Sequence, residues 1–111
     1  MLKKILLALD GSANAEKALP WVRTLACREK AQVVLFRVLP AATDPKRRPQ
    51  ERREAREYLQ GIERELNFAG IPSKLDLRRG KPGPMIAEAA LEEGCDLIIS
   101  GRARCPARPA W

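Results

Sequence analysis

Met1–Ser12 reads MLKKILLALDGS, and this stretch constrains the architecture of the chain more than any other. Ile5 to Leu9 form a short apolar run without polar alternation, and Asp10 begins a polar turn that leads directly into a helical pattern. Such a run is typical of a strand in a parallel sheet that helices cover on both faces. Ligands of these sheets bind in the crevice at the carboxyl ends of the strands. We therefore expect Asp10 to line a ligand site; its alternative role is that of a turn former.

The remaining pattern predicts alternating helices and strands. Apolar residues recur on one helical face from Ala15 to Ala26, so we expect a single helix there, bent at Pro20 because proline removes a backbone hydrogen bond. Leu75 and Leu77 alternate with charged residues, which indicates an edge strand with one wet face. The other expected elements are strands at about 3–9, 32–39, 73–79 and 95–100 and helices at 51–69 and from about 82 to 94.

Composition narrows the classes of protein that remain. A chain of 111 residues forms one domain, and its apolar runs are too short for a membrane span or a signal peptide, so we expect a cytoplasmic protein. The absence of histidine excludes histidine-based catalysis, and the three cysteines form no C-x-x-C pair, which argues against a zinc site. We expect Cys27 and Cys95 to be small buried side chains. The net charge of +7 favours anionic partners in general.

Three segments of the chain together resemble the universal stress protein family. They read ILLALDGSANAEKAL, VVLFRVL and RRGKPGPMIAEAALEEGCDLIISG, and the similarity covers Leu2 to Gly101. The resemblance implies an α/β fold: a three-layer sandwich, Rossmann-like or adenine nucleotide alpha hydrolase-like, with a parallel sheet of four strands here in the order 3-2-1-4. It also implies a regulatory or stress-response function, a protein partner or homodimer, and, in many members, adenine nucleotide binding.

The same resemblance implies where a nucleotide would bind. Family members that bind ATP hold its adenosine part with the loop after the first strand and a residue near the end of the second. The corresponding residues here are Ala8, Asp10 and Val38. A loop of the pattern G-x-x-G-x9-G-S/T follows the fourth strand and takes the phosphates. Gly101 matches the first glycine, Arg104 stands at the second, and the third would lie beyond Trp111.

This departure from the family pattern predicts impaired binding of ATP with Mg. Glycine lets backbone N–H groups approach phosphate oxygens closely, and an arginine at position 104 changes that geometry. Arg102 and Arg104 could still meet phosphates through their charge. As in a shortened family member, we expect residues 1–101 to form the domain and residues 102–111 an irregular basic tail, which leaves the fourth strand with an exposed edge.

Other functions compete with this interpretation. No Walker motif, GxSxG or paired nucleophile and base occurs, so we expect no enzyme activity. One alternative is a protein-interaction module that assembles through the exposed edge of the fourth strand. A second is a polyanion binder that uses the basic residues of 46–56, although interleaved glutamates and the lack of stacking aromatics argue against nucleic acid binding.

Overall fold

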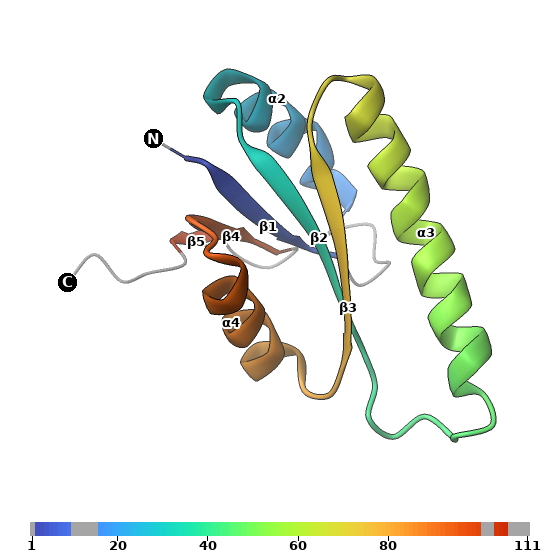
Figure 1. The fold of residues 1–111 in the computed structure, drawn as a ribbon. Helices are drawn as coiled ribbons and strands as arrows, with labels where there is room; N and C mark the ends of the chain where they lie inside the picture. Colours follow the sequence, from blue (N-terminus) through green and yellow to red (C-terminus); the bar gives the residue numbers. More distant parts are fainter. Residues whose placement is uncertain (1, 10–15, 101–103, 107–111) are drawn as a thin grey trace.

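The computed structural model describes residues 2–9, 16–100 and 104–106, the last three by their backbone alone. A five-stranded sheet in the order β3-β2-β1-β4-β5 forms its middle layer, and helices cover both faces (Figure 1). The strands are β1 (Lys4–Ala8), β2 (Gln32–Leu39), β3 (Ser73–Arg79), β4 (Leu97–Ile99) and β5 (Arg104–Pro106). The helices that cover them are α2 (Leu19–Glu29), α3 (Arg48–Phe68) and α4 (Pro82–Glu93).

The first four strands confirm the predicted fold class. β1 lies between β2 and β4 and pairs with both in parallel, and β3 pairs in parallel with the far side of β2. The order of the parallel strands is therefore 3-2-1-4, with connections long enough to hold helices. β3 lies at an edge of the sheet, as its alternating pattern predicts.

The segment after β4 differs from the prediction. Arg104–Pro106 forms β5 and pairs antiparallel with β4, with Arg104 opposite Ile99. The expectations of an irregular tail through these residues and of an exposed β4 edge are therefore wrong. The physical reason is that unpaired N–H and C=O groups along a strand edge favour pairing with any nearby segment. Pro106 does not prevent this, because proline is tolerated in edge strands.

Two hydrophobic clusters hold the helices to the sheet. On one face, α2 and α3 contribute Val22 and Leu59 to a cluster with Leu7 and Leu35 of the strands. On the other face, α4 contributes Ala89 and Ala90 to a cluster with Leu6, Val34 and Phe36 of β1 and β2. Neighbouring residues of β1 and β2 alternate between the two clusters, which is why their apolar runs are unbroken. Each fully buried leucine contributes roughly 1.5–3 kcal/mol relative to an exposed one.

Proline residues mark where two helices begin. The sequence predicts one helix bent at Pro20, but a turn at Ala18 separates the helical residues 16 and 17 from α2, which starts at Leu19. Pro20 therefore occupies a first turn, where its missing N–H costs no hydrogen bond. α3 begins at Arg48 rather than at residue 51, and Pro49 fits its first turn in the same way.

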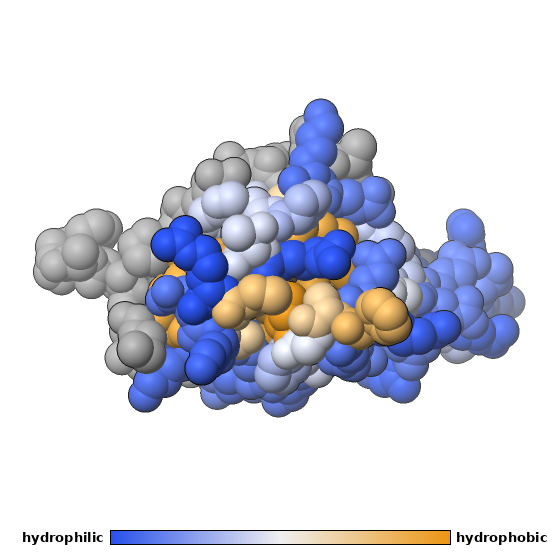
Figure 2. All heavy atoms as spheres, turned by 90° about the horizontal axis from the view of Figure 1, so that it is seen from above, coloured by the Kyte–Doolittle hydropathy of each residue, from blue (hydrophilic) through white to orange (hydrophobic). Residues whose placement is uncertain are grey.

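The end of the molecule at which β2 and β3 begin is mostly hydrophilic. Figure 2 looks onto this end, where hydrophilic side chains surround a small hydrophobic area. Phe68, the last residue of α3, is 96% exposed.

The two described cysteines differ in burial. Cys95 is buried as expected, but Cys27 is exposed, which corrects the buried position predicted for it. Within the described residues, no helix combines the length and the apolar character that crossing a membrane requires.

Candidate functional site

The strand order creates a switch point between β1 and β4. The chain runs from β1 to β2 to β3 in one direction across the sheet, and it then returns to place β4 on the other side of β1. Accordingly, α2 and α3 cover one face and α4 covers the other. At such a point, the carboxyl ends of the two strands border the crevice in which open α/β sheets bind ligands. Leu7 pairs with Ile99, so Ala8 and Ser100 follow at this edge.

Ala8 and Val38 lie on the same face of the sheet near this edge. Ala8 pairs with Phe36, and Val38 follows two residues later in β2. Both side chains are partly buried against the α4-side cluster, together with apolar side chains of α4 and β4. We call these five residues the apolar shelf: Ala8, Val38, Met85, Ile86 and Ile98. A partly open apolar surface of this kind can contact the flat face of an organic ring.

The other predicted nucleotide-binding residues are placed only in part. Three of them lie outside the described residues: Asp10, Gly101 and Arg102. Arg104 is described by its backbone, which begins β5 opposite Ile99. Because Ile99 pairs with Leu7, the backbone of Arg104 lies at the same end of the sheet as Ala8. The structure therefore places Ala8, Val38 and the backbone of Arg104 at the same end of the sheet.

The turn before α4 fixes Met85 on the shelf. Gly80 has a φ of 149°, which other residues rarely adopt, and a Cβ at this position would lie 3.4 Å from Met85 Cγ. The Gly80 N–H donates to the Leu39 carbonyl at 3.0 Å, which anchors the turn to the end of β2. Pro82 and Pro84 both occupy the first turn of α4, so two backbone N–H donors are missing there. This end of α4 supplies an apolar wall and few donors for an anion.

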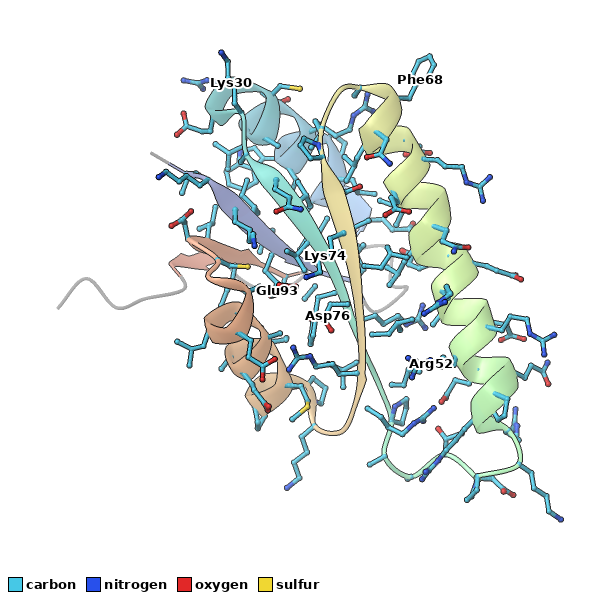
Figure 3. All side chains as sticks on the ribbon, in the orientation of Figure 1. Lys30, Arg52, Phe68, Lys74, Asp76 and Glu93 are labelled. Atoms are coloured by element: carbon cyan, nitrogen blue, oxygen red, sulfur yellow. The ribbon has the colours of Figure 1, made fainter. Side chains whose placement is uncertain are left out.

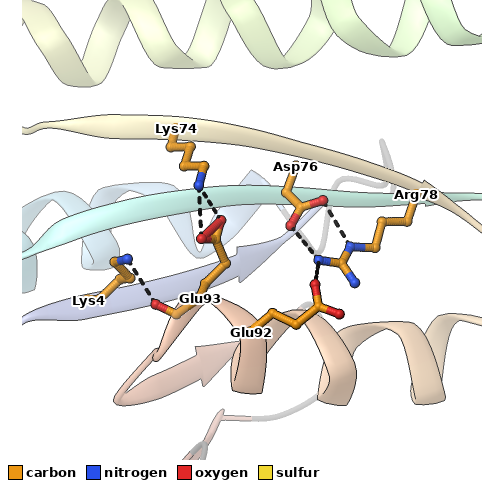
Figure 4. A network of polar contacts seen from close by, with 6 residues as sticks. All are labelled: Lys4, Lys74, Asp76, Arg78, Glu92 and Glu93. Atoms are coloured by element: carbon orange, nitrogen blue, oxygen red, sulfur yellow. Dashed lines mark hydrogen bonds and ion pairs between the residues drawn. The ribbon is translucent and has the colours of Figure 1, made fainter.

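A network of charged side chains joins β3 to α4 next to the shelf (Figure 4). Arg78 pairs with Val38 across the two strands and lies on the same face of the sheet. Its guanidinium donates to Asp76 at 3.0 and 3.2 Å and to Glu92 at 2.6 Å. It also lies 5.9 Å from the centre of the Phe36 ring. The sequence pattern does not predict this network, although the alternation of charges in β3 places three of them on one face.

A second part of the network holds the carboxyl end of α4. Lys74 Nζ lies 2.8 Å from Glu93 Oε2, and Lys4 Nζ donates to the Glu93 carbonyl at 2.8 Å. The hydrogen bond from Arg78 holds the pKa of Glu92 below its usual value, and the hydrogen bond to Glu93 raises the pKa of Lys74. These charges are compensated within the protein. The network therefore fixes α4 on the sheet and does not offer Arg78 to a ligand phosphate.

A cavity of about 380 Å³ lies elsewhere, between the β2–α3 loop and the first turns of α3. Its lining is mainly polar and contains none of the predicted nucleotide-binding residues. Glu51, on its wall, accepts a hydrogen bond from Arg79 at 2.6 Å, which holds the pKa of Glu51 below its usual value. In the described part of the chain, no three potential metal ligands cluster as a metal site would need. The cavity and the apolar shelf are therefore separate features.

Comparison with known proteins places this geometry in a family. A profile described as the universal stress protein family matches residues 1–108. The chain belongs to the universal stress protein family. The match includes all five strands and the three helices described above, which confirms the resemblance found in the sequence.

Individual universal stress proteins support the same assignment. Universal stress protein Sll1388 from Synechocystis sp. is 27% identical over 119 residues, which cover 89% of this chain and 77% of that protein. A crystal structure of a family member from Burkholderia pseudomallei has a TM-score of 0.76 at 29% identity, over 90% of this chain and 81% of that one. A universal stress protein crystallised in complex with cAMP has a TM-score of 0.68 at 17% identity, over 87% of this chain and 70% of that one, a likeness of fold alone.

Proposed function

We propose that this universal stress protein domain binds an adenine nucleotide at the carboxyl ends of β1, β2 and β4. The observation that carries the proposal is the apolar shelf, where Ala8 and Val38 remain partly open beside the switch point. The adenine ring would lie against the shelf, with Asp10 beside the adenosine part. An apolar floor with a few polar groups at its border is the usual composition of a small-molecule site.

The phosphates would extend toward the segment that follows β4. Gly101 permits close approach of the backbone, and Arg102 and Arg104 supply positive charge. Arg104 stands where the family's phosphate loop has its second glycine, so fewer backbone N–H groups would contact a triphosphate with Mg. We therefore propose that the base contributes more to affinity than the phosphates do, and that AMP and cAMP compete well with ATP. The cAMP complex of a protein with the same fold is compatible with this choice of ligand.

The function would be regulatory and would depend on occupancy rather than on turnover. A nucleotide that binds only the folded protein favours the conformation that contacts it, and a partner protein can respond to that conformation. Such a ligand also raises stability, by about 2.7 kcal/mol at a hundredfold excess over its Kd. Ligand binding is therefore measurable without an enzymatic assay.

Thermal unfolding in the presence of ATP with Mg, AMP or cAMP tests the proposal. We expect each adenine nucleotide to raise Tm at millimolar concentration, and uridine nucleotides to raise it less. Val38→Lys places a charged chain on the shelf and is expected to abolish the shift, whereas Val38→Thr keeps the shape of the side chain and is expected to retain most of it. The proposal is overturned if no adenine nucleotide shifts Tm, or if folded Val38→Lys responds as the wild type does.

A further inference from the structure

The solvent side of α3 carries an ordered stripe of residues. Ala55, Leu59, Ile62 and Leu66 form the buried side of this helix. Residues on the opposite side follow the spacing i, i+4, i+7, i+8, i+11 and i+15, which is one face of a helix. All of them are exposed except Gln60, which is partly buried. We call this set the outer stripe: Arg53, Glu57, Gln60, Gly61, Arg64 and Phe68.

Two residues of the outer stripe are unfavourable on a helix face that contacts only solvent. Phe68 is 96% exposed and projects from the end of α3 (Figure 3). Gly61 lies in the middle of the helix, where an added Cβ would meet no atom within 4 Å. The packing of this chain therefore does not require glycine there, and glycine weakens a helix relative to alanine. A small central residue and an exposed aromatic ring both suit a surface that contacts a second helix.

The charges of the outer stripe complement themselves. A two-fold axis through the middle of an antiparallel helix pair would bring Gln60 next to the partner's Gly61. The same axis places Glu57 opposite the partner's Arg64, and Arg53 opposite the partner's Phe68, within reach of a cation–π contact. Within the described structure, neither Glu57 nor Arg64 makes an ion pair, so both charged groups remain available.

We propose that two copies of this chain associate through the outer stripes of their α3 helices, packed antiparallel, with Glu57 of each copy facing the partner's Arg64. From Arg53 to Phe68 the helix is about 22 Å long, at about 1.5 Å per residue. A contact of this length is smaller than a standard stable interface, so the dimer is weak and depends on concentration. It leaves the apolar shelf and both edges of the sheet free.

A second copy fits the stripe better than other occupants do. A nucleic acid would place phosphates against Glu57, which lies between Arg53 and Arg64 along the helix. A lipid surface requires several apolar side chains, and the stripe has one, Phe68. An identical antiparallel helix is the partner that sets each central charge of the stripe against its opposite.

Sedimentation equilibrium of the full chain at low salt, over a wide concentration range, tests the proposal. Glu57→Arg and Arg64→Glu each create two like-charge contacts, and each is expected to weaken self-association about tenfold. An equimolar mixture of these two variants is expected to recover association, because both contacts of the mixed pair again join opposite charges. Glu65→Arg and Arg52→Glu are matched controls, since they make the same charge changes at exposed α3 positions outside the stripe.

Gly61→Gln supplies an independent readout. Glutamine is a better helix former than glycine, so this variant is expected to raise Tm while it weakens association by filling the centre of the contact. The proposal is overturned if the wild type stays monomeric at every concentration, or if the mixture associates no better than either variant alone. It is also overturned if the control variants weaken association as much as Glu57→Arg does.

Discussion

Among single residues, Arg78 of β3 forms ion pairs with two glutamates of α4. Its guanidinium contacts Asp76 and Glu92 and lies 3.8 Å from Glu88, while only 20% of its side chain is exposed. Arg78→Met keeps an apolar stem near Phe36 but leaves Asp76, which is 14% exposed, without its ion pair. We therefore expect the free energy of unfolding to fall by about 1–2 kcal/mol, as measured by urea denaturation.

A matched control separates this effect from the loss of any positive charge. Arg52 is exposed, and within the described residues it makes no ion pair. Arg52→Met should therefore change stability by no more than about 0.5 kcal/mol. Equal losses for the two variants would contradict the role assigned to Arg78.

Asp96 makes stability depend on pH. Its carboxylate accepts hydrogen bonds from the N–H groups of Lys3 and Lys4 at 2.8 and 3.0 Å, which hold its pKa below the usual value. Because the pKa of Asp96 is lower in the folded protein, its ionised carboxylate stabilises the fold. This stabilisation is fully present above the unfolded pKa of about 4, and it is lost as pH falls through the folded pKa. Asp96→Asn cannot titrate, so we expect its stability to fall less steeply below about pH 4. Urea denaturation across this pH range checks the slope, and an unchanged slope would contradict the assignment.

Among the elements, glycine has opposite effects at the end and in the middle of a helix. Gly94 ends α4 with a φ of 68°, a conformation that strains other residues. Gly94→Ala is therefore expected to lower stability by about 1 kcal/mol. Gly61 lies inside α3 with open space around it, so Gly61→Ala is expected to raise stability by up to about 1 kcal/mol. Thermal unfolding followed by circular dichroism, at low protein concentration, measures both; shifts of the same sign would contradict this explanation.

Elements with a strong local pattern can be predicted to the residue, whereas those that depend on distant contacts cannot. Both β2 and β3 occupy the predicted residues, because one has an apolar run at its centre and the other alternates between apolar and charged residues. The start of α2 differs from the predicted one, because periodicity alone does not show that Pro20 belongs to a first turn. The short strand β5 has little strand propensity of its own, and it exists because β4 offers an edge to pair with.

For the whole molecule, one part of the candidate site follows from local sequence patterns and another part depends on distant contacts. The family pattern named Ala8 and Val38, and the parallel register places them on one face, so this part of the site is predictable. The Arg78 network is not, because it depends on how far α4 lies along β3, which sequence patterns do not specify. Local patterns therefore predict where the carboxyl ends of the strands lie. Tertiary packing determines which charges near these ends are already paired within the protein.

The pairing of β5 with β4 links the sheet edge to the candidate site. Ile99 pairs with Leu7 on one side and with Arg104 on the other. A chain that ends at residue 103 would lose the antiparallel ladder, so we expect the amide protons of β4 to exchange with solvent about tenfold faster or more. Those of Val33–Phe36 in β2 should keep their protection, because β1 and β3 flank that strand. Native-state hydrogen exchange measures both regions.

The order of β4 also bears on the proposed nucleotide site, because β4 borders the switch point. If β4 loosens alone, Ala8 loses its ordered neighbour at the switch point, and this shorter chain also lacks the charge of Arg104, so the proposed affinity for a nucleotide should fall together with β4 protection. Equal protection of β4 in the two chains would contradict a stabilising role for β5. Loss of protection throughout β2 would instead mean that the removed residues stabilise the whole sheet. Such an effect would be larger than the pairing of the three-residue strand β5 with β4 can explain.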